Sequence, residues 1–351
     1  MNIWIDVCHT PQFNFFKPVI EILSQKGHRI YLTVLDRGKT PTIVQHDVAS
    51  LPNVVVDIVG RHRMNKWSAI FEANILRMCR LIGWACGKKI DVSFTTSMFP
   101  PLISKLYGFK VYTFGDDAQV FDFKIKDRFA TRCHMCMYEW TLPEPKPAHT
   151  EILRCTKEWA YLNPRTFVPR VEVLERYGVK PKEYMFLREV TVGTINYTGQ
   201  ESGAILGIKD MIPKGMKVLF SLEEKKRRQE YPADWILLQE PIEEIHSLIY
   251  YSAGLVSSGD SMAREAALLG VPAYYLGIRY SMPANAAASK VASLQNRQTM
   301  PFEEWIAQFQ IADCRLMIDE LEKRQQALRA KIDEEFIDIN QYMLDLVERG
   351  N

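Results

Sequence analysis

Short apolar segments alternate with helical patterns along most of this 351-residue chain, and this alternation narrows the choice of folds more than any other feature. The apolar segments contain few polar residues, as strands buried on both faces of a parallel sheet do. In the first half, the predicted strands are residues 2–7, 29–35, 54–60, 91–96 and 110–115, and the predicted helices are 13–26, 39–49, 67–87 and 99–107. This order predicts a doubly wound parallel α/β sheet.

The same alternation starts again after a proline-rich segment, residues 144–150, which resists both helix and central strand. The second series has predicted strands at 184–190, 216–222, 235–239, 254–258 and 272–277, and predicted helices at 224–231, 242–251 and 261–269. We therefore predict two Rossmann-like domains, residues 1–143 and 151–312, joined by the linker 144–150. Residues 313–351 have spaced apolar positions among many charges, which predicts one or two amphipathic helices.

The composition is that of a soluble globular protein, with 47% hydrophobic and 25% charged residues. The odd number of cysteines, seven, favours a reducing compartment, and we expect a cytoplasmic protein. Cys133 and Cys136 form a C-x-x-C pair without a second pair at zinc spacing, so we expect buried thiols in a strand and no metal site.

Positive charge is concentrated in the first domain. Residues 1–143 contain 18 Lys and Arg against 12 Asp and Glu, whereas the whole chain has a net charge of only +2. Solvated surface charge explains such an excess most simply, and an anionic acceptor or a membrane surface is the alternative. Within this domain, residues 60–89 combine bases with Trp67 and Trp84, which is compatible with weak peripheral membrane contact or with a core-facing helix.

Polar residues follow the strands of the first domain, where an open α/β sheet binds its ligands. Asp6 and His9 come at the end of the first strand, and His9 is a candidate general base or else a helix cap. Asp116 and Asp117 follow the fifth strand and would hold a metal ion or contact sugar hydroxyls, or else act as a helix cap and a solvated acid, which is the simpler interpretation.

In the second domain, Arg188 lies near the end of a strand, where it would bind a phosphate in a bidentate manner or pair with an acid. The turn Ser258-Gly259-Asp260-Ser261 leads from a strand into a helix, whose N-terminus favours an anion. Glu265 lies one turn into that helix and would accept hydrogen bonds from ribose hydroxyls. Phosphate binding and simple helix capping both fit this turn.

Four segments in this order resemble a family of predicted archaeal and bacterial glycosyltransferases with a GT-B-like fold, which is similar to the non-hydrolysing UDP-GlcNAc 2-epimerases. The segments are the opening "IWIDVCHTPQFNFFKPVIEILSQKGHRIYLTVLDRG", "YLNPRTFVPR", "FLREV" and "SSGDSMAREAALLGVP". The resemblance runs from Asn2 to about Lys290 and is most specific in the run that starts at Met262. The family's turn reads Gly-Gly-Gly-Thr-Met, so this chain has Asp260 in place of a glycine.

The resemblance implies two facing Rossmann-like domains, with the nucleotide-sugar donor in the second and the acceptor in the first. Their places at the ends of strands in the first domain make His9, Asp6 and Asp116 our candidate catalytic residues. The nucleotide-sugar site would consist of Arg188, Ser258, Gly259, Ser261, Met262 and Glu265. The partners would be a nucleoside diphosphate sugar and a glycan or lipid-linked acceptor, with no metal, no other cofactor and no nucleic acid.

Three functions are compatible with these residues. The first is a glycosyltransferase of polysaccharide biosynthesis. The second is an enzyme like the UDP-GlcNAc 2-epimerases, which needs an acid and a base around C2 of the sugar and no acceptor. The third is a non-catalytic GT-B relative that binds a nucleotide or a glycan.

Overall fold

The chain folds into two compact units. The computed structural model describes residues 1–61, 71–117, 122–139, 147, 149–192, 199–239, 242–280, 282–309 and 314–349. The first unit contains Met1–Tyr161 and Ile337–Asn351, and the second contains Leu162–Phe336. The two units meet along the sequence at residue 161, later than the predicted linker, of which residues 144–146 and 148 lie outside the described residues.

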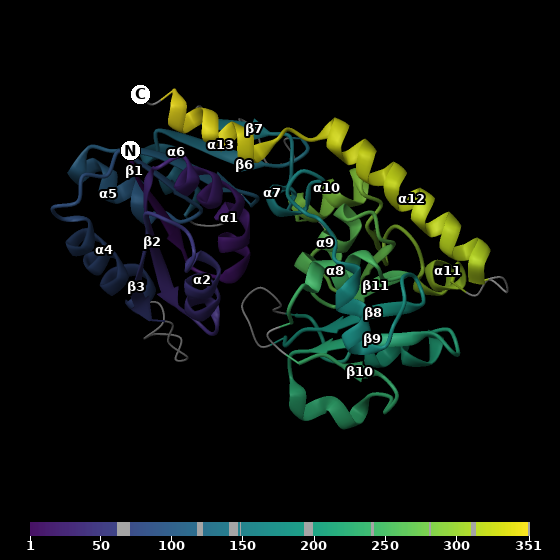
Figure 1. The fold of residues 1–351 in the computed structure, drawn as a ribbon. Coiled ribbons are helices and arrows are strands. Elements are labelled where there is room, and N and C mark those ends of the chain that lie inside the picture. Colours follow the sequence, from purple (N-terminus) through teal and green to yellow (C-terminus); the bar gives the residue numbers. More distant parts are fainter. Residues whose placement is uncertain are drawn as a thin grey trace. The chain divides into compact units, whose positions relative to one another are not determined.

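The first unit has a seven-stranded sheet in the order β3-β2-β1-β4-β5-β6-β7, and all of its paired strands are parallel (Figure 1). Its strands are β1 (Asn2–Val7), β2 (Arg29–Asp36), β3 (Val54–Arg61), β4 (Val92–Thr95), β5 (Lys110–Gly115), β6 (Arg132–Cys136) and β7 (Thr150–Leu153). Its helices are α1 (Thr10–Gln25), α2 (Thr40–Val48), the π-helix η1 (Glu72–Leu76), α4 (Arg77–Ala85), α5 (Phe99–Tyr107), α6 (Phe123–Phe129) and α13 (Ile339–Glu348), and α7 (Trp159–Leu162) ends this part of the chain. The five predicted strands are confirmed.

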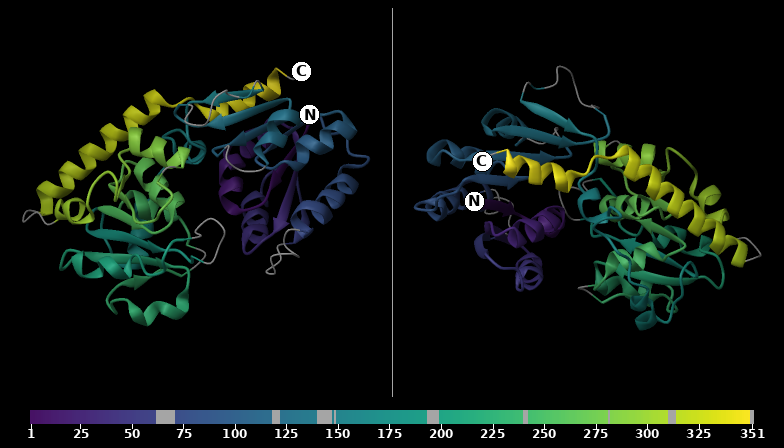
Figure 2. Two further views of the ribbon diagram at one scale, coloured as in Figure 1. Left: turned by 180° about the vertical axis from the view of Figure 1, so that it is seen from behind. Right: turned by 45° about the horizontal axis from the view of Figure 1, so that its top comes forward.

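The first unit is larger than the predicted domain 1–143, because two later segments join it. Strand β7 pairs with β6, with Cys133 opposite Thr150. Helix α13 lies beside these two strands in both views of Figure 2, and the hydroxyl of its Tyr342 lies 3.1 Å from His134 Nε2 and 3.2 Å from Glu151 Oε2. The predicted amphipathic segment 313–351 therefore forms two helices, and only the second of them belongs to this unit.

The second unit has a six-stranded parallel sheet in the order β10-β9-β8-β11-β12-β13. Its strands are β8 (Tyr184–Glu189), β9 (Lys217–Leu222), β10 (Ile236–Leu237), β11 (Gly254–Ser257), β12 (Ala273–Tyr275) and β13 (Gln295–Asn296). Its helices are α8 (Ile245–Tyr250), α9 (Asp260–Leu268), α10 (Pro283–Val291), α11 (Phe302–Ala307), α12 (Cys314–Glu335) and the 3-10 helices η2 (Val171–Tyr177), η4 (Leu206–Met211) and η5 (Lys225–Glu230). The strands predicted for the second half are confirmed.

Helix α12 is hydrogen-bonded to the C-terminal ends of two helices of the second unit. Gln325 Nε2 donates to the carbonyl oxygens of Tyr250, at the end of α8, and Leu269, just after α9, at 3.0 and 2.9 Å. Gly270 follows with φ +75°, and a Cβ atom there would lie 2.6 Å from the Gln325 carbonyl oxygen. Glycine is therefore required at position 270, both for its left-handed backbone and for the close approach of α12.

The described helices give no support for a membrane span. None of them combines the length and the apolar character that crossing a bilayer requires. Of the predicted interfacial segment 60–89, residues 62–70, which include Trp67, lie outside the described residues. Peripheral membrane contact therefore stays a prediction.

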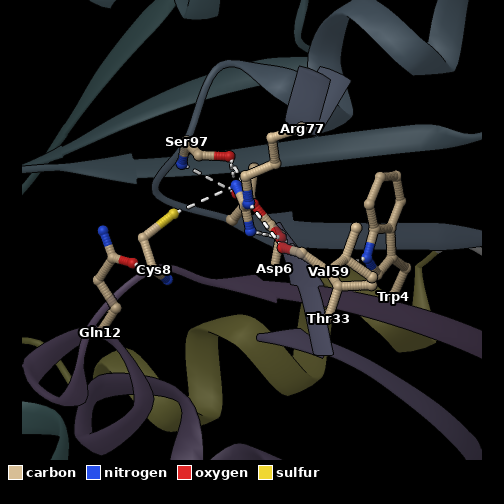
Figure 3. Close-up of polar contacts among 9 residues, drawn as sticks. Trp4, Asp6, Cys8, Gln12, Thr33, Val59, Arg77 and Ser97 are labelled. Carbon is tan, nitrogen blue, oxygen red and sulfur yellow. Dashed lines mark hydrogen bonds and ion pairs between the residues drawn. The ribbon is translucent and has the colours of Figure 1, made fainter. Parts of the chain in front are cut away.

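A buried ion pair ties the centre of the first sheet to helix α4 (Figure 3). Asp6, at the end of β1, is fully buried, and its Oδ1 lies 2.7 Å from Arg77 Nη2. The hydroxyls of Thr33 and Ser97 donate to its two oxygens at 2.6 and 2.8 Å, so that both are fully engaged. Gly60 makes room for this arrangement, because a Cβ atom there would lie 3.0 Å from the Arg77 side chain. The geometry favours a structural role for Asp6 over the predicted catalytic one.

Replacing Asp6 tests this structural role. Asp6→Ala would leave the buried Arg77 guanidinium without its anion, which typically costs about 3–5 kcal/mol. We expect urea denaturation to show a loss of that size in the free energy of unfolding of the first unit. Glu348→Ala is the matched control, since its pair with Lys26 at 2.8 Å is exposed and is worth at most about 1 kcal/mol. Equal, small losses for the two variants would contradict the structural role.

Candidate functional site

Each sheet reverses its strand order beside the first strand of its unit. In the first unit β1 lies between β2 and β4, and in the second unit β8 lies between β9 and β11. Open parallel sheets bind ligands outside the carboxyl ends of the strands at this reversal. The predicted site residues lie at or just after these strand ends: Asp6 and His9 at β1, Arg188 at β8, and the turn 258–261 after β11.

The turn between β11 and α9 is hydrogen-bonded to the end of β8 and to the residue that follows it. Ser258 N donates to the carbonyl oxygen of Arg188 at 3.0 Å, and Ser258 Oγ accepts from Val190 N at 2.9 Å. The Ser258 carbonyl accepts from Gln200 Nε2 at 2.8 Å. Ser258 is fully buried, so it positions the turn rather than exposing a group to a ligand.

Some backbone N–H groups of this turn already donate hydrogen bonds to neighbouring side chains. Gly259 N donates to Ser257 Oγ at 3.0 Å, and Ser261 N donates to Asp260 Oδ1 at 3.0 Å. With Ser258 N bonded to β8, three of the N–H groups that we expected to face an anion already have acceptors. Ser261 and Met262 are half-buried, whereas the other residues of α9 are buried.

Asp260 is turned into the protein, where two arginines surround it. Only 3% of the residue is exposed. Its Oδ2 lies 3.1 Å from Arg264 Nη1 and 3.3 Å from Arg279 Nη1. Two guanidinium groups thus meet the Asp260 carboxylate at the N-terminus of α9, where the helix dipole adds partial positive charge. The negative charge of Asp260 is therefore directed at these arginines and not at the surface of the turn.

Arg279 is the site residue that the sequence did not reveal. Its side chain is 27% exposed, whereas that of Arg264 is 5% exposed and is held by Asn285 Oδ1 at 2.6 Å. Arg279 N donates to the hydroxyl of Tyr275 at 3.1 Å, which places the loop after β12 beside the turn after β11. The four-residue spacing of Asp260 and Arg264 indicates a helical i,i+4 pair. The approach of Arg279 to Asp260 depends instead on the pairing of β11 with β12, which lies outside such local patterns.

Arg188 has protein partners at the end of β8. It donates to Ser221 Oγ at 2.6 Å and forms an ion pair with Glu223, and only 17% of its side chain is exposed. The adjacent Glu189 does not pair with Arg188. It is buried and accepts from Ile205 N at 2.7 Å, and burial raises the pKa of its carboxyl group. The acid that we expected beside Arg188 is therefore Glu223.

Glu265 lies on α9, five residues after Asp260, and is nearly buried. Its Oε2 is 3.4 Å from His246 Nε2, and the side chain of Glu265 is 11% exposed. His246 belongs to α8 and has its ring edge-on to Phe167. The predicted ribose acceptor thus lies beside a histidine that the sequence did not connect with it.

In the first unit, His9 lies just before α1 and does not cap it with its side chain. His9 Nδ1 is buried and has no hydrogen-bond partner among the described residues. Burial lowers the pKa of His9 to about 4, the positive charges of Lys157 and Arg37 contribute, and Asp116 opposes them. The imidazole is therefore neutral at neutral pH, as a general base must be.

Asp116 is an ion-pair partner in the same unit. Its Oδ1 lies 2.9 Å from Lys157 Nζ. Both members of this pair act on the pKa of His9, whereas Asp6 forms its ion pair with Arg77. Among the described residues, no group of three or more His, Cys, Asp or Glu side chains has the geometry to hold a metal ion. Cys133 and Cys136 are buried in β6, as predicted.

Comparisons with known proteins identify the fold. No protein-family model and no curated protein sequence matches the chain. The glycosyltransferase VinC in complex with DTDP has a TM-score of 0.65 and 12% identity, covering 100% of this chain and 99% of VinC. A putative UDP-N-acetylglucosamine 2-epimerase from Listeria monocytogenes also has a TM-score of 0.65 and 12% identity, covering 99% and 95%. UDP-GlcNAc 2-epimerase from Neisseria meningitidis bound to UDP-GlcNAc has a TM-score of 0.63 and 10% identity, covering 99% and 100%.

These similarities extend over both units, although few residues are identical. At 10% to 12% sequence identity, the comparison shows a shared fold. The two parallel α/β sheets, the helices that connect their strands and the C-terminal helices are those of the fold class predicted from the sequence. The chain has the GT-B-like fold that glycosyltransferases and UDP-GlcNAc 2-epimerases share.

Proposed function

We propose that this protein is a GT-B glycosyltransferase that moves a sugar from a nucleoside diphosphate sugar to a glycan or lipid-linked acceptor in polysaccharide biosynthesis. The observation that carries the proposal is the partly exposed guanidinium of Arg279, which lies beside the N-terminus of α9 while Asp260 faces inward against Arg264 and Arg279. The N-terminus of α9 lies after β11, at the reversal of strand order where parallel sheets bind ligands. Structural neighbours bound to DTDP and UDP-GlcNAc support a nucleotide-sugar donor.

The donor diphosphate would bind the partly exposed Arg279, beside the start of α9. A guanidinium matches phosphate oxygens in charge and in geometry, and the helix dipole adds to the attraction. Glu265 would accept hydrogen bonds from the ribose hydroxyls, with His246 holding its carboxylate in place. The diphosphate gains negative charge as it leaves the sugar, so these positive groups would stabilise the transition state.

The acceptor hydroxyl would need a general base, and the neutral imidazole of His9 is our candidate. The acceptor oxygen would form a bond to the anomeric carbon while the bond from that carbon to the diphosphate breaks. The diphosphate would take the bonding electron pair, and the hydroxyl proton would pass to the His9 imidazole. Asp116 would act indirectly, since it neutralises the charge of Lys157 near His9.

Calorimetric titration with UDP and TDP tests the donor site. We expect Arg279→Ala and Glu265→Ala to weaken binding roughly tenfold or more, because each removes a hydrogen bond to a charged group worth about 1.5–3 kcal/mol. Arg188→Ala should weaken binding less, because Glu223 already pairs with that guanidinium. Arg176→Ala, which removes an exposed guanidinium paired with Glu243, is the control. Absence of binding to any nucleoside diphosphate would overturn the proposal.

A UDP-GlcNAc 2-epimerase is the second candidate function, because two of the structural neighbours above are such epimerases. An epimerase converts its substrate without any acceptor, whereas a transferase does not. We expect incubation with UDP-GlcNAc alone, followed by proton NMR, to leave the configuration at C2 unchanged. Formation of the 2-epimer would replace the transferase proposal with the epimerase. Tight nucleotide binding without turnover across donors and acceptors would favour a non-catalytic relative.

A further inference from the structure

Two loops of the first unit meet beside His9. Strands β1 and β2 are adjacent and parallel, with Val7 opposite Val34, so the chain leaves both strands at the same edge. The hydroxyls of Thr10, which starts α1, and Thr40, which starts α2, lie 3.1 Å apart. This contact joins the His9 loop to the loop Arg37–Lys39 that follows β2.

The loop 37–39 contains two cations and follows the exposed acid Asp36, so residues 36–39 together carry one surplus positive charge. Arg37 and Lys39 are exposed, and neither side chain has a hydrogen-bond or ion-pair partner among the described residues. The first turns of α1 and α2 contain no acidic residue, so the positive ends of both helix dipoles add to this charge. By contrast, the other cation near His9, Lys157, is paired with Asp116 at 2.9 Å.

His9 lies on the loop that meets this segment. Its Nδ1 is buried and has no hydrogen-bond partner among the described residues, so the protein itself does not satisfy this imidazole. Three charged groups act on the imidazole: Lys157 and Arg37 disfavour its protonation, and Asp116 favours it. Since Asp116 offsets Lys157, Arg37 is the remaining cation that an incoming anion would neutralise.

We propose that the acceptor carries an anionic group, a phosphate or a carboxylate, which binds Arg37 and Lys39 and sets the attacking hydroxyl beside His9. This inference rests on the proposed glycosyltransferase function and adds the chemical class of the acceptor. The bound anion would also offset the charge of Arg37 and so raise the pKa of His9 from about 4 towards the range of an effective base. An anionic acceptor would thus improve the base that deprotonates it, and a neutral acceptor would not.

NMR of the His9 imidazole in the full-length protein tests this site. Inorganic pyrophosphate and glucuronate are titrated separately, with UDP present in saturating amounts to occupy the donor site, and the His9 signal is assigned from His9→Gln. We expect saturable shifts of the His9 signal and a higher His9 pKa with at least one anion. A response to pyrophosphate alone identifies a phosphate group, and a response to glucuronate alone identifies a carboxylate.

Variants at the two ends of β2 provide the matched comparison. Arg37→Gln should weaken the anion response roughly tenfold or more, raise the His9 pKa in the absence of anion, and leave UDP affinity unchanged. Arg29→Gln removes an exposed cation from the opposite end of the same strand and should preserve the anion response. No shift at His9 with either anion, or an equal shift in Arg37→Gln, would overturn the inference. Loss of UDP binding would instead count against the donor site, so the two failures are distinguishable.

Discussion

The parallel order of both sheets is the constraint on which the candidate site depends. Parallel strands end at one edge of the sheet, and the order reverses beside β1 in the first unit and beside β8 in the second. This geometry brings the turn before α9 next to the end of β8, and His9 next to the Arg37 loop. The two parts of each pair lie far apart in the sequence, so it is the sheet topology that brings them together in space.

The direction of the Asp260 carboxylate decides whether the turn before α9 can bind an anion. A carboxylate at this position would repel a diphosphate if it faced outward. In this protein Asp260 faces inward and binds Arg264 and Arg279, and it also occupies the N–H group of Ser261. An anion at this turn would therefore meet the guanidinium of Arg279 and not the backbone N–H groups that a glycine-rich turn would supply.

Local patterns in the sequence predicted much of the fold. The buried strands and the turn at Ser258–Ser261 are continuous features whose periodicity and turn residues can be read directly. Contacts at long sequence separation could not be read in this way. Arg77 reaches Asp6 across 71 positions, and Arg279 reaches Asp260 only because β12 pairs with β11. Asp6 was predicted to be catalytic from its place at the end of β1, and the buried Arg77 that favours a structural role cannot be found from the sequence. The assignment of β7 and α13 to the first unit also depends on tertiary pairing.

A crystal structure with bound UDP would test the central claim most directly, namely that Arg279 and the start of α9 form the diphosphate site. The account predicts phosphate oxygens within hydrogen-bond distance of the Arg279 guanidinium, ribose hydroxyls at the Glu265 carboxylate, and Asp260 still paired with Arg264. UDP bound elsewhere in the second unit, with Arg279 making no contact to phosphate, would contradict it.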